Sequence, residues 1–364
     1  MRVAVLGGGL SGALLAWRLA QQPDVERVSL APGPARDRDA TAASGGAVRG
    51  YETEAGQRRL ALDSLLELRA DARLRDWAGY TVTGSIYRPI ETGRLAEQAA
   101  EVENALPDSV RLLTAAELRD QGWADLEADA DLGADADPGS GPVAVAERHA
   151  GFLGPERLRS RVLADLAGRH TVELLPDGAV TGLAAGEFEL AGVRHRADVV
   201  VLAAGAWTPA LLRAAGFDSA GLRSKAIQYT VFEVIGWRPG TFVDEVTSLY
   251  GKPAGDGQLI GLPTRLWDVP ADGGQPDQAL SDEVFALAQR RFPRLRLTPG
   301  ARPVLAPDCY SDNSRLELRP VAGTDGRLCT FTGGSGGAAK TALAASARAA
   351  RQLAGDARTA GVTG

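Results

Sequence analysis

Residues 2–12 read RVAVLGGGLSG, and an apolar run follows to about residue 21. The first five of these residues predict a short buried strand, and the later run predicts a helix. Between them, Gly7, Gly9 and Gly12 have the G-x-G-x-x-G spacing of a turn that binds a dinucleotide. The first glycine permits the tight turn, the second lets the backbone approach a pyrophosphate, and the third lets helix and strand pack closely. The helix start at Leu10 and Ser11 offers N–H groups to the anion.

The composition excludes several classes of protein. A chain of 364 residues that is 45% hydrophobic and 24% charged predicts about two closely joined domains with a sizeable core. The net charge of -6, without a dense basic cluster, argues against nucleic acid as a partner. Two cysteines and three scattered histidines disfavour a disulfide scaffold or a metal site. No apolar run approaches the roughly 18 residues of a membrane span, so we expect a soluble, cytoplasmic protein.

The remaining sequence predicts alternating strands and helices, as in an α/β fold. Strands are expected at residues 27–30, 77–90 with a turn at Gly84, 171–175, 179–183, 198–204, 226–234, 248–251, 258–262 and 328–332. Helices are expected at residues 54–74, 151–169, 282–291 and from the glycine run at 333–337 to 353, and Thr114 with Glu117 forms a capping box that predicts another. The acidic segment 125–137 predicts a solvated loop, because it lacks the ordered ligands of a calcium loop.

The end of the second strand leaves the kind of dinucleotide open. An acidic residue that holds the ribose is usual about 20 residues after the glycines, but Ala31 stands there. Arg36 and Arg38 follow, and such arginines admit the 2′-phosphate of NADP. Asp37 or Asp39 could instead contact the ribose from the loop. Both interpretations remain open on these residues.

The chain as a whole resembles the flavin-dependent D-amino acid oxidase superfamily, in particular its glycine oxidase and sarcosine oxidase branch. Besides the N-terminal turn, four segments are similar to those of the family and follow in the same order. They are Ala43-Ser44-Gly45-Gly46, Gly151-Phe152-Leu153-Gly154-Pro155, the stretch DVVVLAAGAW at 198–207, and Gly333-Gly334-Ser335-Gly336-Gly337. The resemblance implies FAD as the cofactor.

The resemblance also implies which residues contact FAD and how the chain is divided. The expected contacts are Gly7, Gly9, Leu10, Ser11, Gly12, Ala43, Ser44, Gly45, Gly46, Val180, Ala204, Gly205, Gly334, Ser335, Gly336 and Gly337. The second glycine loop opens a helix and therefore directs N–H groups at negative charge on a reduced flavin. A discontinuous Rossmann-like FAD-binding domain is expected at residues 1–75, 145–220 and 302–360. A substrate domain with a mixed or antiparallel sheet is expected at 76–144 and 221–301.

Three side chains are the candidates for substrate binding. Arg49 matches an arginine that holds the substrate carboxylate in sarcosine oxidases, a role that a two-pronged guanidinium suits. Lys340 matches a second, carboxylate-side lysine, and Tyr250 belongs to a segment similar to the substrate strand Tyr-Gly-x-Pro. The alternatives are a surface arginine, a solvated helix lysine and a tyrosine that only packs.

Two positions depart from the family pattern. Leu259 stands about where sarcosine oxidases have a lysine that helps dioxygen accept electrons, and Lys252 is too far along the chain to be assumed as its substitute. Lys340 could provide a replacement charge. Cys309 lies near the position of a cysteine that links the flavin covalently, but the residues after it match loosely. We therefore expect non-covalent FAD and interpret both cysteines as small hydrophobes.

The reaction implied is oxidation of the C–N bond of a small amino acid or N-substituted glycine to an imine that water hydrolyses. Dioxygen is the expected acceptor, with slower reoxidation than in a sarcosine oxidase and hydrogen peroxide as product. A biosynthetic role is one option. The alternatives are an NADP-dependent reductase and a protein that binds FAD without catalysis.

Overall fold

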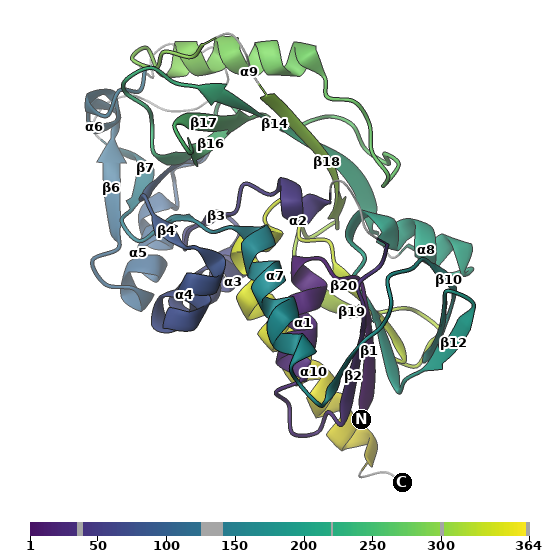
Figure 1. The fold of residues 1–364 in the computed structure, drawn as a ribbon. Helices are drawn as coiled ribbons and strands as arrows, with labels where there is room; N and C mark the ends of the chain where they lie inside the picture. Colours follow the sequence, from purple (N-terminus) through teal and green to yellow (C-terminus); the bar gives the residue numbers. More distant parts are fainter. Residues whose placement is uncertain (35–38, 125–140, 220, 299–301, 362–364) are drawn as a thin grey trace.

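A computed structural model describes residues 1–34, 39–124, 141–219, 221–298 and 302–361. Its first layer is a six-stranded sheet (Figure 1). In spatial order the strands are β19 (Glu317–Pro320), β20 (Leu328–Thr332), β13 (Val199–Leu202), β1 (Arg2–Leu6), β2 (Arg27–Ala31) and β9 (Val172–Leu174). All neighbours are parallel except β19 and β20. The sheet is covered on both faces, which explains why its central strands β1 and β13 are almost entirely apolar.

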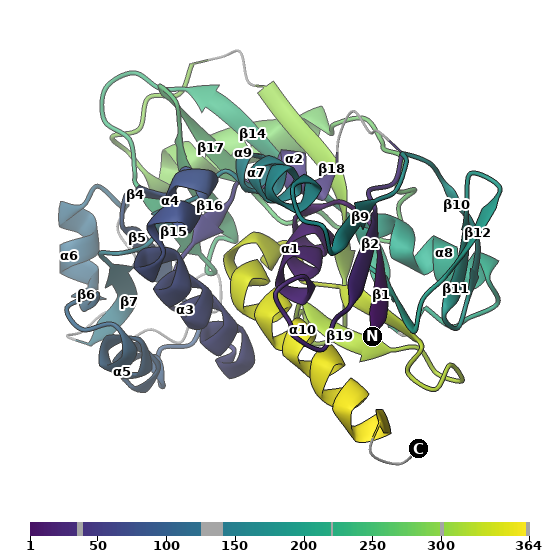
Figure 2. The same ribbon diagram turned by 60° about the horizontal axis from the view of Figure 1, so that its bottom comes forward.

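Alternate residues of β1 enter two separate cores. Val3 and Val5 pack with helices α1 (Leu10–Leu19), α7 (Pro155–Ala167) and α10 (Ala338–Gly361). Ala4 and Leu6 pack on the other face with β11 (Glu187–Leu190) and α8 (Thr208–Ala214). β11 lies between β10 (Val180–Ala184) and β12 (Val193–Arg196) in a small sheet. Figure 2 shows α10 running beside α1, an arrangement that α3 (Ala55–Ala70) extends by packing on α10.

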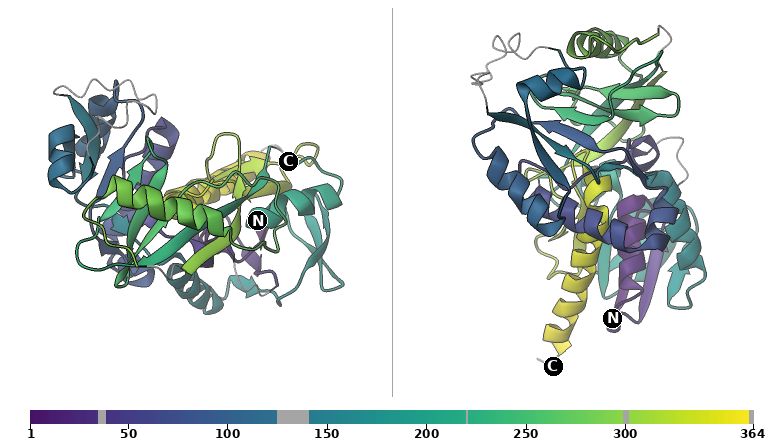
Figure 3. Two further views of the ribbon diagram at one scale, coloured as in Figure 1. Left: turned by 90° about the horizontal axis from the view of Figure 1, so that it is seen from above. Right: turned by 90° about the vertical axis from the view of Figure 1, so that its left-hand side faces the viewer.

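The second layer is an eight-stranded, mostly antiparallel sheet. Its order is β18 (Arg302–Tyr310), β14 (Arg223–Glu233), β17 (Gly257–Gly261), β16 (Leu249–Ala254), β15 (Thr241–Asp244), β5 (Ser85–Arg88), β7 (Pro142–Glu147) and β6 (Val110–Thr114). Helix α9 (Gln278–Arg291) covers its outer face (Figure 3, left) and buries Val284 and Ala288 in a third core. Helices α5 (Leu95–Ala105) and α6 (Ala115–Asp120) flank β6.

A short three-stranded sheet joins the two layers. It consists of β3 (Ala47–Val48), β8 (Gly151–Phe152) and β4 (Thr81–Val82), and α2 (Ala40–Ala43) precedes it. Because residues 151–152 pair with two other segments, the helix predicted from residue 151 begins only at Pro155. β3 carries the chain directly into the segment that holds Arg49.

The α/β class with a Rossmann-like sheet is confirmed, and the expected strands and glycine turns of that sheet are present. The single helix expected at 54–74 is wrong. It divides into α3 and α4 (Ala72–Ala78) at Asp71, whose carboxylate accepts the Arg73 N–H at 2.8 Å as the cap of α4. Trp77, expected in a strand, therefore lies in α4. The capping box of Thr114 and Glu117 is confirmed at the start of α6.

Some expectations stay predictions. The domain boundaries remain as stated, although β7 and β18, placed at the edges of the predicted FAD domain, pair within the eight-stranded sheet. The acidic segment 125–137 lies outside the described residues. Among the described helices, none combines the length and apolar character that crossing a membrane requires.

Candidate active site

A cavity of about 800 Å³ lies between the two large sheets. The six-stranded sheet contributes the turn after β1 and the ends of β2, β13 and β20. The eight-stranded sheet contributes residues of β14, β16, β17 and β18. Sixteen predicted cofactor contacts were named from the sequence, and of these all but Gly12 line the cavity. The structure therefore brings together loops that are more than 300 residues apart in the chain.

The three glycines of the N-terminal turn differ in whether the fold itself requires glycine at that position. Gly7 has φ +126°, and a Cβ there would collide with the Ala203 carbonyl. A Cβ on Gly12 would collide with the Gly7 carbonyl inside the turn. At Gly9, φ is −63° and an added Cβ would meet only Thr41 Oγ1, at 3.4 Å, where the backbone forms the cavity wall. The polypeptide itself therefore does not require glycine at position 9, whereas a ligand lying on the backbone does.

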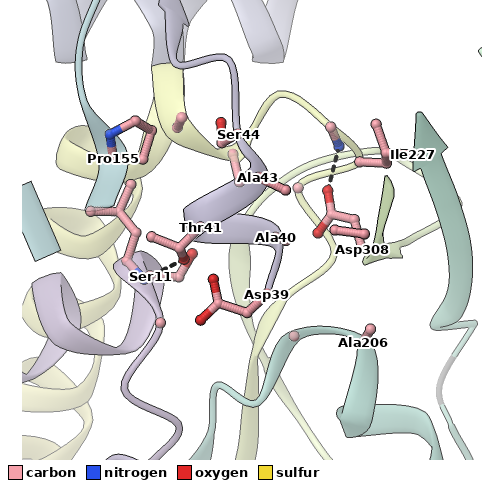
Figure 4. Close-up of a pocket in the computed structure, with 18 of the residues that line it drawn as sticks. Ser11, Asp39, Ala40, Thr41, Ala43, Ser44, Pro155, Ala206, Ile227 and Asp308 are labelled. Carbon is pink, nitrogen blue, oxygen red and sulfur yellow. Dashed lines mark hydrogen bonds between the residues drawn. The ribbon is translucent and has the colours of Figure 1, made fainter. Parts of the chain in front are cut away.

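The loop after β2 carries an acidic side chain into the cavity wall. Asp39 caps α2 by accepting the Ala42 N–H at 2.8 Å, and it forms an ion pair with Arg159 at 2.5 Å. In Figure 4 the neighbouring Thr41 faces the start of α1, where its hydroxyl accepts the Leu10 N–H at 3.0 Å. Of the ribose candidates, Asp39 is thus at the cavity, while Arg36, Asp37 and Arg38 lie outside the described residues.

The Ala43–Gly46 loop forms the wall near the middle of the cavity. Gly46 has φ +64° and leaves no room for a side chain against the Leu153 carbonyl. Gly45 faces the opposite wall, because an added Cβ would lie 3.4 Å from Leu259 Cδ1 and 3.7 Å from Lys252 Cε. Gly45 therefore packs close to the side chains of β16 and β17, and a larger residue at this position would press on both of them.

The C-terminal glycine loop, residues 333–337, leads directly into α10. Its Gly336 N–H donates to Asp308 Oδ2 at 2.9 Å, a bond drawn in Figure 4. Burial raises the pKa of Asp308, and hydrogen bonds from the Cys309 and Gly336 N–H groups oppose the change. Asp308 was not predicted from the sequence. Alternation along β18 is the available signal, since it places Asp308 and Tyr310 on the cavity side and Cys309 on the other.

Cys309 points away from the cavity. Its side chain is 1% exposed and packs in the core that contains Leu6 and Leu202. Burial raises the pKa of the thiol to about 12. The interpretation of Cys309 as a small core hydrophobe agrees with this position, and the residue does not belong to the cavity lining.

Arg49 lies at the cavity and is 8% exposed, so the alternative of a surface arginine is wrong. Its Nε donates to the Tyr51 carbonyl at 3.1 Å, and its guanidinium lies 4.9 Å from the centre of the Tyr87 ring. Its Nη2 is 2.7 Å from Glu52 Oε1. Burial disfavours the charged guanidinium, but nearby carboxylates, Glu52 first, outweigh this and raise the pKa of Arg49.

Lys340 and Arg49 both form ion pairs with the Glu52 carboxylate. The Lys340 Nζ lies 2.9 Å from Glu52 Oε1, and its side chain is 13% exposed, so it is not a solvated helix lysine. The ammonium folds back over Gly337, where a Cβ would lie 2.8 Å from Nζ. Burial lowers the pKa of Lys340, and the attraction of Glu52 opposes the change. The bridging Glu52 was not predicted, because nothing near it in the sequence indicates its partners.

The segment around Arg49 is fixed by a second buried carboxylate. Glu147, at the end of β7, accepts the N–H groups of Gly50 at 2.7 Å and Tyr51 at 3.0 Å. Burial raises the pKa of Glu147. Since both of its oxygens bind backbone, this residue orients the loop that carries Arg49 and Glu52.

Tyr250 lines the cavity from β16, opposite Gly261, whose missing side chain leaves room for the ring. Its hydroxyl donates to the Gln228 carbonyl at 3.2 Å. Burial raises the pKa of Tyr250, so the phenol is neutral. The residue is thus close enough to contact a ligand, and its hydroxyl also has a structural partner.

The position of Lys252 corrects a sequence-based expectation. Lys252 was expected to lie too far from Leu259 to replace the charge missing there. The two residues are cross-strand partners in β16 and β17, and both line the cavity opposite Gly45. The ammonium lies 4.1 Å from the centre of the Phe152 ring and donates to the Pro253 carbonyl at 3.2 Å. Burial lowers the pKa of Lys252. Unlike Lys340, it forms no ion pair with a described carboxylate.

The sequence matches a known enzyme family over nearly its whole length. The family model described as DAO, FAD dependent oxidoreductase, matches residues 2–353. The chain belongs to this family. The DAO family is FAD dependent, which supports FAD as the cofactor, and Gly9 and the loops at 43–46 and 333–337 line the cavity.

Solved structures support the fold over nearly the whole chain. L-proline dehydrogenase from P. horikoshii has a TM-score of 0.76 at 16% identity, covering 97% of this chain and 92% of its own. Glycine oxidase from Geobacillus kaustophilus has 0.71 at 18%, covering 98% and 95%. Glycine oxidase from Bacillus cereus ATCC 14579 has 0.70 at 14%, also covering 98% and 95%. No curated protein sequence matches. The DAO chain therefore shares its fold with enzymes that act on different amino acids.

Proposed function

We propose that this DAO-family protein oxidises the C–N bond of glycine or a small N-substituted glycine. The observation that carries the proposal is the pair of buried cations, Arg49 and Lys340, at one cavity that also contains the three glycine-rich loops. FAD, when bound, supplies the chemistry by accepting a hydride from the carbon beside the amine. Water then hydrolyses the imine product to an amine and a carbonyl compound.

The FAD contacts are proposed from the loops that line the cavity. The backbone of Gly9, Leu10 and Ser11 would lie against the pyrophosphate, and Gly12 allows the close turn beneath it. The Ala43–Gly46 and Gly334–Gly337 loops would hold the ring system, and Val180, Ala204 and Gly205 would contact the remaining part. Of the ribose candidates in the loop after β2, Asp39 would make the contact, because it lines the cavity. Because Cys309 faces the core, non-covalent binding is proposed.

The substrate would be held by its carboxylate. Arg49 has guanidinium N–H groups beyond those that bind Tyr51 and Glu52, and two charge-assisted hydrogen bonds from such a group fix a carboxylate in direction as well as position. Lys340 has further N–H donors for the same carboxylate. The neutral Tyr250 hydroxyl would orient the amine. Fixing the carboxylate in this way aligns the carbon to be oxidised, which is the protein's main contribution to the rate.

The acceptor is proposed to be dioxygen, with Lys252 as the cation that supports it. Negative charge develops on dioxygen as it takes up electrons, and a preorganised cation stabilises that charge most in a site that excludes water. Lys340 is less suitable for this role than the sequence suggests, because Glu52 neutralises it. Lys252 faces Gly45 without such a partner among the described residues.

Anaerobic mixing of the purified yellow protein with a panel of amines tests the proposal. N-methylglycine and glycine should bleach the visible absorption, whereas the matched amines without a carboxylate should bleach it far more slowly. Bleaching by NADPH alone would favour an NADP-dependent reductase, and no bleaching by any amine would favour a protein that binds FAD without catalysis. A product assay on larger N-carboxymethyl amines would address a biosynthetic role.

A further inference from the structure

One carboxylate is shared by the two cations that are proposed to hold the substrate. Glu52 Oε1 lies 2.7 Å from Arg49 Nη2 and 2.9 Å from Lys340 Nζ. The Glu52 side chain is 11% exposed, so water screens these ion pairs little. Arg49 and Lys340 line the cavity, whereas Glu52 lies behind them. The cations therefore face the ligand space and the anion faces away from it.

The other charged groups near Arg49 have partners of their own. Glu147 is bound to the N–H groups of Gly50 and Tyr51. Glu245 accepts the Tyr87 hydroxyl and the Ile90 N–H, and the Tyr87 ring stands against the guanidinium. Neither forms an ion pair with Arg49 or Lys340 among the described contacts. Glu52 is thus the carboxylate that directly sets the charge of this pair.

We infer that Glu52 determines substrate specificity by leaving the Arg49–Lys340 pair with one net positive charge. That charge matches a substrate with a single carboxylate. A second carboxylate would find no second net positive charge in this pair, because Glu52 already compensates one of the two cations, and a ligand charge left without a partner is a common means of rejecting a wrong ligand. This inference rests on the proposed function, because it takes Arg49 and Lys340 as the carboxylate anchor.

The substrate class becomes narrower as a result. Glycine and N-alkyl glycines carry one carboxylate and suit the site. Substrates with two neighbouring carboxylates, such as iminodiacetate, are disfavoured in spite of the two cations. Without Glu52 the same pair would carry two positive charges and would suit the dianion.

The test compares a monoanion with a dianion on the FAD-loaded protein. Acetate and malonate are titrated into the native chain, Glu52→Gln and Glu97→Gln, the last being a control that removes an exposed carboxylate paired with Arg94. Binding is read from the flavin absorption spectrum and, independently of flavin, from the rise in unfolding temperature. In Glu52→Gln we expect malonate to bind about tenfold more tightly and acetate to change by less than about threefold. Glu97→Gln should match the native chain.

A rescue experiment tests the same charge balance without malonate. Lys340→Met keeps Glu52 and removes one cation, so acetate should bind about tenfold more weakly. Adding Glu52→Gln to Lys340→Met restores one net positive charge and should recover most of the acetate affinity. A role for Glu52 in merely positioning the cations predicts weaker binding of both ligands in Glu52→Gln and no rescue. Either result would overturn the inference, as would equal gains for acetate and malonate.

Failure of the inference can be told from failure of the proposed function. A protein that binds FAD and is bleached by N-methylglycine, but whose Glu52→Gln variant shows no preference for malonate, retains the function and loses the inference. A native protein that binds neither acetate nor malonate by either readout loses the carboxylate anchor, and the inference fails with it.

Discussion

Lys252 and Leu259 stand directly opposite each other on the antiparallel strands β16 and β17. Lys252 Cε and Leu259 Cδ1 lie 3.7 Å and 3.4 Å from the position of a Cβ on Gly45, so both side chains cover the same part of the cavity. Cross-strand neighbours on one face have Cβ atoms about 5 Å apart whatever their distance in sequence. A lysine on either strand can therefore place its ammonium at the same part of the cavity. Comparison of aligned sequence positions does not detect such an exchange.

Gly9 and Gly12 should respond differently to the addition of one side chain. In Gly9→Val the added Cβ meets only Thr41 Oγ1 within the fold, at 3.4 Å, but the side chain places atoms where the pyrophosphate is expected. It should therefore be folded and colourless. Gly12→Ala collides with the Gly7 carbonyl and should lower stability by about 1–3 kcal/mol. The visible spectrum and the unfolding temperature check the two outcomes, and a stable yellow Gly9→Val would contradict the assigned contact.

The parts of the fold that could be predicted are those with local signals. The glycines at 7, 9 and 12 follow an apolar strand within one short stretch, and Thr114 and Glu117 form a cap three residues apart. β18 has only the alternation around Asp308 as a signal, because Pro303 and Pro307 disfavour a strand interior. These prolines are tolerated because β18 lies at the edge of its sheet, paired only with β14 among the described strands.

The candidate site could be predicted only where single positions match the pattern of the family that the sequence resembles. Arg49 and Lys340 match cations of that family, so they could be proposed as carboxylate anchors. Glu52 could not be placed, because its partner Lys340 lies almost 290 residues later. Glu147 has the same difficulty, since its role depends on N–H groups 97 and 96 residues earlier. Long-range pairing of this kind follows from the tertiary fold alone.

Arg49→Ala should weaken the binding of carboxylate substrates more than it weakens the binding of FAD. The substitution removes a two-pronged hydrogen-bond donor to the carboxylate, and loss of a charged partner costs about 1.5–3 kcal/mol, or one to two decades in affinity. Steady-state and anaerobic reduction kinetics with N-methylglycine measure the effect, with Arg94→Ala, an exposed arginine paired with Glu97, as the control. Unchanged KM and reduction rate would remove Arg49 from this role.

FAD should leave the protein on acid denaturation. Cys309 packs in the core, and burial raises its thiol pKa to about 12, so it stays protonated and unreactive at neutral pH. After precipitation with acid, the yellow colour should remain in the supernatant for both the native chain and Cys309→Ala. Colour retained in the native pellet but released from Cys309→Ala would demonstrate a covalent link.

Lys252→Met should slow reoxidation by dioxygen by about a hundredfold, the usual effect of removing one preorganised electrostatic group, while leaving anaerobic reduction nearly unchanged. Lys340→Met should do the reverse, because Lys340 is paired with Glu52 at the carboxylate anchor. Exchanging the cross-strand pair, as Lys252→Leu with Leu259→Lys, returns the cation to the same wall and should recover most of the rate.

Burial lowers the pKa of Lys252, and the protonated form is the one that acts. The native rate should therefore fall as pH rises through a pKa below that of a free lysine, and Lys252→Met should lose this dependence. Stopped-flow mixing of reduced enzyme with oxygenated buffer measures all three variants, and equal rates in Lys252→Met and the native chain would exclude Lys252 as the supporting cation.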